Sequence, residues 1–264
     1  MDYLKEAIRI ARLAGSRIQK LREQNAFSLH NKSHNELVTS ADLESNNIIK
    51  NEIAKCFPSH KYISEEEFNG ENIDVESPTW IVDPIDGTVG YANGHYQVAV
   101  SIAFIQSGRV KVGVVHNPFL NETFYASEGL GAYLNDTKIT VTNNCTLKQS
   151  VIGTGIPHDR ENLSNVLSSL AVMLPQIRDI RRLGSPALDI CWVACGRLQG
   201  FYEGLLYPWD VAAARFIAIM AGASVGNYRH SAEADEAVQI INGRNVLISA
   251  PAIYKELQNI LNCN

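Results

Sequence analysis

The sequence lacks the features that mark membrane, secreted and low-complexity proteins. None of its apolar runs approaches the ~20 residues that a membrane-spanning helix needs. Its first residues show neither the basic stretch nor the apolar run of a secretory signal. No repeat, biased tract or linker rich in Pro, Gly and Ser divides it. We therefore expect one compact cytoplasmic domain over residues 1–264, without a membrane partner.

Cysteine is sparse. The five cysteines are an odd number, without the dense spacing of a disulfide framework. Cys191 and Cys195 would share one face of a helix, but no Cys-x-x-Cys or nearby His completes a zinc set. They are predicted to be small core residues.

Basic residues do not gather into a block. The chain has 23 Lys and Arg against 28 Asp and Glu, a net charge of −5. This balance argues against a nucleic-acid partner bound through charge alone. A substrate that carries phosphate would therefore need bound cations to attract it.

The apolar pattern alternates between helical and strand periods, which predicts a layered α/β fold. Predicted helices cover 2–24, a segment ending near 56, 160–173, 186–196, 210–221 and a segment from about 251. Predicted strands end at 63 and 82 and cover 98–105, 110–115, 122–126, 132–141, 151–154, 177–181, 201–203 and 246–249. The N-terminal half, 1–147, would carry most of the acidic site and the C-terminal half, 148–264, would complete it.

The most informative segment is 80–88, Trp-Ile-Val-Asp-Pro-Ile-Asp-Gly-Thr, in which an apolar strand delivers two acids three residues apart. Pro84 fixes the backbone between Asp83 and Asp86. A turn here can aim both carboxylates and the Ile85 carbonyl at one point, and Mg²⁺ prefers such oxygen ligands.

The residues that follow these acids suit a phosphate. Gly87 and Thr88 would offer free N–H groups if a helix begins there. The alternative is an ordinary turn, because Asp, Pro and Gly are common turn residues. Neither the Asp-x-Asp spacing of an aspartyl nucleophile nor a P-loop or dinucleotide fingerprint is present.

Further acids stand at predicted strand and helix ends. Glu65, Glu66 and Glu67 follow the strand ending at Ile63, although such a run is usually a solvated surface. Asp210 and Asp42 each stand where a helix begins, and either could simply stabilise that helix.

Taken in order, these segments resemble the inositol monophosphatase family of lithium-sensitive, magnesium-dependent phosphatases. Five pieces carry the resemblance: Lys32 with 37–42 (Leu-Val-Thr-Ser-Ala-Asp), 63–66 (Ile-Ser-Glu-Glu), 80–88, 182–187 (Arg-Leu-Gly-Ser-Pro-Ala), and Tyr202-Glu203 with 208–210 (Pro-Trp-Asp). The resemblance implies an αβαβα sandwich, a homodimer and two to three Mg²⁺ ions in each site.

The resemblance also implies a role for each matching residue. Metal ligands would be Glu66, Asp83, the Ile85 carbonyl, Asp86 and Asp210; catalytic residues would be Asp42, Glu66 and Thr88; substrate-binding residues would be Gly87, Thr88, Gly184, Ser185, Glu203 and Asp210. A water would attack phosphorus directly, without a phosphoenzyme.

Departures from the usual family pattern leave the substrate open. Ser64 stands where Gly is usual, Val89-Gly90-Tyr91 replaces Thr-Asn-Phe, and Pro186 replaces Ala. Inositol monophosphate is the leading candidate. Histidinol phosphate, phosphoadenosine phosphate, a sugar phosphate, or a weakly active member with a regulatory binding role are the alternatives.

Overall fold

The computed structural model describes residues 2–31, 37–157, 163–228 and 241–262. Its α-helices are α1 (Tyr3–Glu23), α2 (Ser40–Cys56), α3 (Thr88–Ala92), α4 (Leu163–Met173), α5 (Pro186–Ala194), α6 (Pro208–Met220) and α8 (Tyr254–Asn262). Short 3₁₀ turns cover Leu147–Gln149, Leu174–Gln176 and Pro251–Ile253. Two short strands, β1 (Leu29–Asn31) and β2 (Leu37–Thr39), pair in an antiparallel ribbon.

A seven-stranded sheet occupies the first half of the chain, in the order β3-β4-β5-β6-β7-β8-β9. Its strands are β3 (Lys61–Ser64), β4 (Thr79–Asp86), β5 (Ala99–Gln106), β6 (Arg109–Asn117), β7 (Glu122–Ser127), β8 (Gly131–Leu134) and β9 (Thr137–Lys138). β3 and β4 are parallel, and each later pair is antiparallel.

A five-stranded sheet occupies the second half, in the order β11-β10-β12-β14-β13. Its strands are β10 (Val151–Thr154), β11 (Asp179–Arg181), β12 (Gly200–Glu203), β13 (Ser224–Asn227) and β14 (Val246–Ser249). β10 pairs in parallel with β11 and β12, whereas β14 is antiparallel to β12 and β13.

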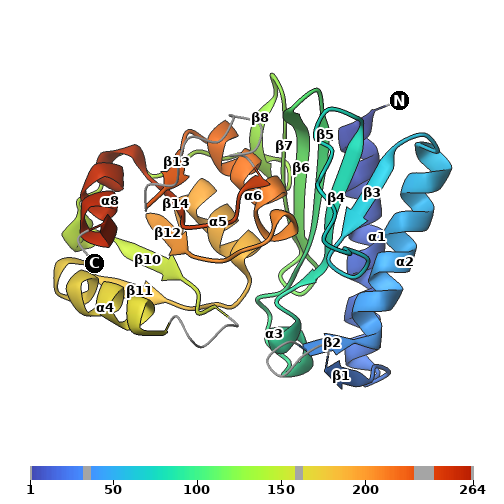
Figure 1. Ribbon diagram of the computed structural model, residues 1–264, viewed down its shortest axis with the longest axis horizontal. Helices are drawn as coiled ribbons and strands as arrows, with labels where there is room; N and C mark the ends of the chain where they lie inside the picture. Colours follow the sequence, from blue (N-terminus) through green and yellow to red (C-terminus); the bar gives the residue numbers. More distant parts are fainter. Residues whose placement is uncertain (1, 32–36, 158–162, 229–240, 263–264) are drawn as a thin grey trace.

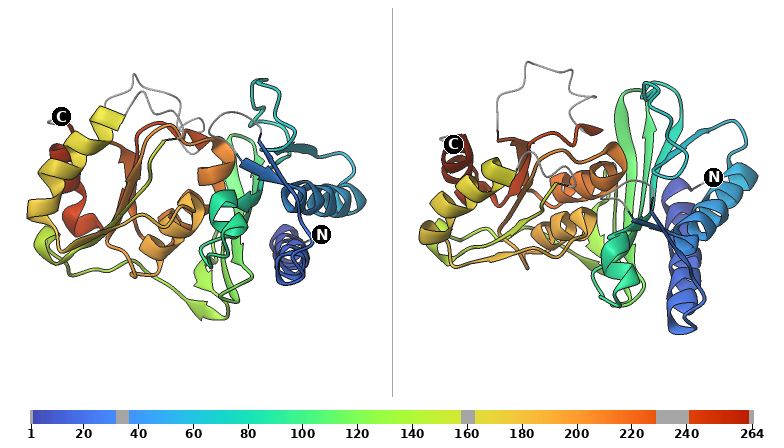
Figure 2. Two further views of the ribbon diagram at one scale, coloured as in Figure 1. Left: turned by 90° about the horizontal axis from the view of Figure 1, so that it is seen from below. Right: turned by 60° about the horizontal axis from the view of Figure 1, so that its bottom comes forward.

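The helices and the two sheets stack in five layers (Figures 1 and 2). α1 and α2 cover the outer face of the larger sheet, α5 and α6 lie between the sheets, and α4 and α8 cover the outer face of the smaller one. This is the αβαβα arrangement that the family resemblance implies. No helix in the described parts of the chain is long and apolar enough to cross a membrane.

Successive side chains of the central strands point alternately into two hydrophobic cores. On β4, Trp80 and Val82 join the core under α1 and α2, whereas Ile81 joins the core around α5 and α6. The latter core also contains Phe201 of β12 and Ile248 of β14, so it joins both halves of the chain. Successive side chains point to opposite faces of the sheet, and helices cover both faces. Almost every residue of these strands is therefore buried, so their sequences are continuous apolar runs.

α6 lies directly against the larger sheet. A Cβ at Gly113 of β6 would come within 2.6 Å of the Ala213 carbonyl oxygen of α6. The absence of a side chain at residue 113 therefore permits this close approach, which carries the first turn of α6 to the end of β4.

Most predicted elements are confirmed, and the differences have local causes. The predicted strand 132–141 ends at Leu134 because Asn135 adopts a φ of +52° and starts a tight turn into β9. β1, β2, β13 and α3 were not predicted, since they are short or polar. The predicted start of the helix at 160 and the matching residue Lys32 lie outside the described residues.

Candidate active site

The site begins where β4 ends. The β4–β5 register shifts between Asp83 and Asp86, so the strand turns at this point. An oxygen of Asp83 accepts the Ile85 N–H at 3.0 Å, and the Ser45 hydroxyl of α2 donates to the Pro84 carbonyl at 2.9 Å. These bonds hold the turn, and both acids are buried, with exposed fractions of 2% and 3%.

Asp86 is positioned by the start of α5. Its Oδ2 accepts the Ser185 hydroxyl and, at 2.9 Å, the Ala187 N–H. Ser185 is fully buried and is not among the residues that line the pocket, whereas its neighbours Gly184 and Pro186 are. Ser185 therefore orients Asp86 through its side chain, and its contact with a substrate stays a prediction.

Asp210 enters the site from the first turn of α6. One of its oxygens accepts the Tyr207 N–H at 2.8 Å, as the third residue of a helix often does. The acid thus both caps α6 and lines the pocket.

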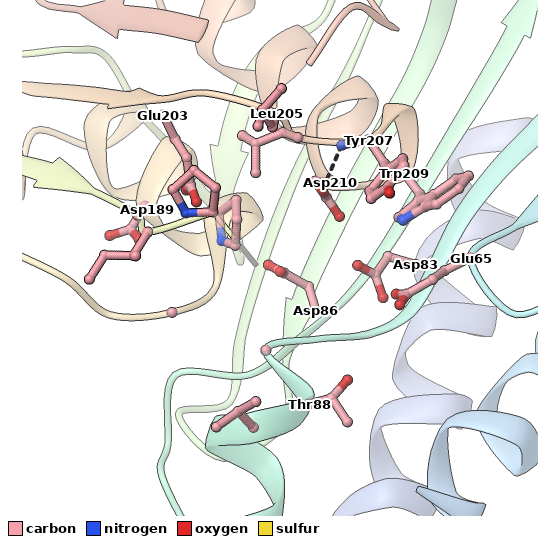
Figure 3. Close-up of a pocket in the computed structure, with 18 of the residues that line it drawn as sticks. Glu65, Asp83, Asp86, Thr88, Asp189, Glu203, Leu205, Tyr207, Trp209 and Asp210 are labelled. Carbon is pink, nitrogen blue, oxygen red and sulfur yellow. Dashed lines mark hydrogen bonds between the residues drawn. The ribbon is translucent and has the colours of Figure 1, made fainter. Parts of the chain in front are cut away.

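Glu65 lines the pocket, and Glu66 is not among the lining residues. The parallel register pairs Ser64 with Val82, and the Glu65 N–H donates to the Val82 carbonyl at 3.2 Å. One further step sets Glu65 beside Asp83, and Figure 3 shows their carboxyl groups side by side. Glu65 and Glu66 both belong to the turn that follows β3. The charge of Glu66 adds to the rise that burial causes in the pKa of Asp42, so the predicted role of Glu66 stays a prediction.

Thr88 begins α3, directly after Gly87, whose φ is +94°. Its hydroxyl lies 2.9 Å from Asp42 Oδ1 and 3.1 Å from the Ile85 carbonyl oxygen. Asp42 is fixed by a capping box with Thr39 at the start of α2. The Thr88 hydroxyl thus donates to a carboxylate that the start of α2 holds in place.

These elements enclose a pocket of about 140 Å³. Six acids line it: Glu65, Asp83, Asp86, Asp189, Glu203 and Asp210. Arg182 is the one basic side chain among the described lining residues. Figure 3 shows Glu65 and Asp83 on one side of the pocket, with Asp189 and Glu203 across it.

Burial dominates the electrostatics of the pocket. It raises the pKa of Asp86 to about 7 and that of Asp210 to about 7, and it raises the pKa of Asp83 well above its ordinary value. Neighbouring carboxylates add to each rise, since like charges disfavour ionisation. No group of three or more His, Cys, Asp or Glu side chains among the described residues is already gathered as a metal cluster. The buried Asp83 and Asp86 and the half-buried Asp210 are nevertheless a donor set that suits a hard divalent cation.

Two acids occupy the opposite wall. Burial raises the pKa of Glu203 to about 8, helped by Asp210 and opposed by Arg182. A Cβ at Gly155 would overlap the Glu203 carboxylate, so Gly155 makes room for it. Asp189 was not predicted from the sequence; it is buried in α5, and its Oδ1 has no hydrogen-bond partner among the described residues. Asp189 stands within an apolar helical run, so the surrounding sequence has no pattern that indicates a functional acid.

Comparison with known proteins agrees with this geometry. A model of the Inositol monophosphatase family matches residues 1–262. The chain belongs to the inositol monophosphatase family. Inositol monophosphatase 1 of Solanum lycopersicum is 39% identical over 226 residues, covering 84% of this chain and 82% of that protein. Nus factor SuhB of Vibrio cholerae is 37% identical over 253 residues, covering 95% and 92%.

Solved structures of the inositol monophosphatase family share the fold. An IMPase of Thermotoga maritima is 32% identical, with a TM-score of 0.85, covering 99% of this chain and 97% of that one. The sequence resemblance and the layered fold are thereby confirmed. The names of the relatives divide between inositol monophosphatases and SuhB Nus factors.

Proposed function

We propose that this protein hydrolyses a small phosphomonoester with the help of Mg²⁺, and that inositol monophosphate is its leading substrate. The observation that carries the proposal is the convergence of Asp83, Asp86 and Asp210 on one pocket from β4 and α6. Two buried acids and a half-buried one that repel one another are costly without cations, and such a cost is typical of functional sites.

Asp83, the Ile85 carbonyl, Asp86 and Asp210 would hold the ions together with a glutamate of the turn after β3. That glutamate would be Glu65, which lines the pocket, or Glu66, which the family resemblance indicates. Mg²⁺ bound there would acidify a water and neutralise charge on the phosphate. Ser185 and the Ala187 N–H orient Asp86, and the Tyr207 N–H orients Asp210.

Thr88 and Asp42 would handle the proton of the attacking water. Burial raises the pKa of Asp42 to about 6. Asp42 accepts a hydrogen bond from the hydroxyl of Thr88, which lines the pocket. The backbone N–H groups of Gly87 and Thr88 would bind phosphate oxygens. Gly184 and Glu203 would meet the alcohol part of the substrate.

The test is phosphate release from myo-inositol 1-phosphate by the purified protein, with Mg²⁺ and with excess EDTA. Magnesium-dependent release that EDTA abolishes supports the proposal. Absence of release from this ester and from a panel of other phosphomonoesters overturns it. Lithium inhibition and a homodimeric state, which family membership favours, are separate measurements on the same preparation.

A second candidate follows from the relatives named as Nus factors, which favour a role in transcription. The net charge of −5 without a basic block disfavours direct RNA binding through charge, so such a role would need protein contacts. If the second candidate is correct, a variant without phosphatase activity, such as Asp86→Asn, would keep that role.

A further inference from the structure

The buried face of α2 changes from polar to apolar along the helix. Asp42, Ser45 and Asn46, in its first two turns, are each at most 3% exposed, and the buried Ile49 and Ile53 follow. A spacing of three and four residues places the three polar side chains on one face. Figure 1 shows that α2 begins at the end of the larger sheet where β4 leads into α3. Buried polar groups are costly unless they are hydrogen-bonded, so their partners show what these residues do.

Asp42 and Ser45 contact two different segments of the active site. Asp42 accepts a hydrogen bond from the Thr88 hydroxyl at the start of α3. Ser45 Oγ donates to the Pro84 carbonyl at 2.9 Å, within the turn that carries the two acids of β4. Ser45 is not among the residues that line the pocket, so it can affect the site only through this turn.

Asn46 contacts the third segment, the turn after β3. The Glu67 N–H donates to the Ser64 carbonyl at 3.2 Å, which closes this turn with Glu65 and Glu66 as its two middle residues. Asn46 Nδ2 donates to Glu67 Oε1 at 2.9 Å. Whichever of the two middle glutamates binds an ion, the contact between Asn46 and Glu67 fixes the turn that carries it.

Neighbouring residues in turn fix Asn46 and Glu67. Tyr62 Oη of β3 donates to Asn46 Oδ1 at 2.7 Å, so both polar atoms of the Asn46 amide have a partner. Lys50, one helical turn after Asn46, pairs with Glu67 Oε2 at 2.6 Å. Glu67 is therefore bound to α2 through both carboxylate oxygens, which suits an anchor for the turn.

We propose that Ser45 and Asn46 are positioning residues of the metal site: they hold the β4 turn and the glutamate turn at one fixed separation and thereby set the affinity for Mg²⁺. The proposal rests on the proposed phosphatase function, because the ligands that it positions are those assigned there. Neither side chain carries a charge or lines the pocket, so an effect on metal binding must act through the position of other groups. Mg²⁺ demands a near-ideal octahedral set of oxygens, so a shift of either turn should weaken its binding.

The test is calorimetric titration of Mg²⁺ into the metal-free protein, without substrate, for the wild type, Ser45→Ala and Asn46→Ala. Each substitution should raise the Kd for Mg²⁺ by about 10-fold, the lower end of the range for residues that hydrogen-bond behind metal ligands. Ser150→Ala is the matched control, because Ser150 is also fully buried and donates to a backbone carbonyl, that of Thr146, at 2.8 Å. Ser150 does not line the pocket, so its substitution should leave the Kd unchanged.

A double substitution tests whether Asn46 acts through Glu67. In a Glu67→Ala background, adding Asn46→Ala should raise the Kd by less than about twofold, because the group that Asn46 holds is already absent. A further rise of about 10-fold would overturn this route. The comparison is made at constant charge, since both proteins lack the Glu67 carboxylate.

Urea unfolding in EDTA measures the stability of each variant separately from its metal affinity. A role confined to packing would lower stability and leave the Kd of the folded protein within about twofold of the wild-type value, and that result in both single variants would overturn the proposal. Each turn is tested by its own variant, so misfolding of one variant leaves the other decisive. Absence of Mg²⁺ binding by the wild-type protein would overturn the proposed function together with this inference, whereas wild-type binding with unchanged variants would overturn this inference alone.

Discussion

At the scale of the residue, the turn after β3 brings two neighbouring glutamates to the edge of the site. Glu65 lines the pocket, whereas Glu66 is not among the lining residues and adds to the burial-raised pKa of Asp42. Glu65→Gln should therefore raise the Mg²⁺ concentration for half-maximal activity by at least about 10-fold, because it removes an oxygen-donor charge. Glu66→Gln is the matched control and should shift it less than about twofold. Magnesium titrations of phosphate release measure both, and the reverse order would return the assignment to Glu66.

Substitution of Asp86 should lower activity without lowering stability. Asp86→Asn keeps an acceptor for Ser185 and the Ala187 N–H but removes one charge from the acidic cluster. Turnover should fall at least about 100-fold, because a two-metal clamp loses a ligand charge. The melting temperature without metal should not fall, since repulsion with Asp83 and Asp210 is relieved. Near-normal turnover would contradict the ligand assignment.

The acids of the pocket that could be predicted from the sequence are those whose local spacing or position at a helix start already indicates a site. Asp83 and Asp86 share one short turn, and Asp210 stands at a helix start, so local pattern was sufficient. The position of Glu65 at the pocket could not be predicted in this way, because it depends on how the end of β3 pairs with β4 across the sheet. Ser185 required the position of α5 relative to β4, more than ninety residues away in sequence. Asp189 gave no local signal.

At the scale of the element, the contact of α6 with β6 depends on a residue without a side chain. Gly113→Ala would push a methyl group against the backbone of Ala213 and should cost about 1–3 kcal/mol of unfolding free energy. Gly90→Ala in α3 is the matched control, because its nearest neighbours lie at 3.5 Å or more. It should be neutral or stabilise by up to about 1 kcal/mol. Urea unfolding of both variants measures the difference, and equal effects would contradict this account of α6 packing.

Long, strongly periodic elements were predictable, and short ones were not. α1 and β5 have clear periods and appear within one residue of the predicted bounds. β13 is polar and half-buried, so its pairing with β14 depends on the sheet and not on its own pattern. α3 has five residues, too few for a helical period.

At the scale of the whole molecule, the acidic pocket couples stability to pH and to Mg²⁺. Burial raises the pKa of Asp86 and Asp210 to about 7 and that of Glu203 to about 8. Unfolded acids titrate near about 4, so between pH 4 and 8 the folded state binds more protons than the unfolded state. These groups therefore make the metal-free protein less stable as pH rises through that window.

Mg²⁺ binds the ionised carboxylates, so the stabilisation that Mg²⁺ provides should increase as the pH rises. The rise in melting temperature on adding Mg²⁺ should be larger at pH 8 than at pH 5.5, measured by thermal unfolding against an EDTA control. Asp86→Asn should reduce the rise at pH 8. A rise that is equal at both pH values, or larger at pH 5.5, would contradict a site built from these acids.

The pairing order of the smaller sheet has a consequence for synthesis on the ribosome. β14 is the last strand in sequence, yet it lies inside the sheet and pairs with both β12 and β13. Nascent chains fold from the N-terminus, so the larger sheet can form while β14 is still being made. Until β14 emerges, β12 and β13 each lack a neighbour and expose unpaired backbone groups. The nascent chain is therefore most prone to mispairing in the interval between the synthesis of β13 and that of β14.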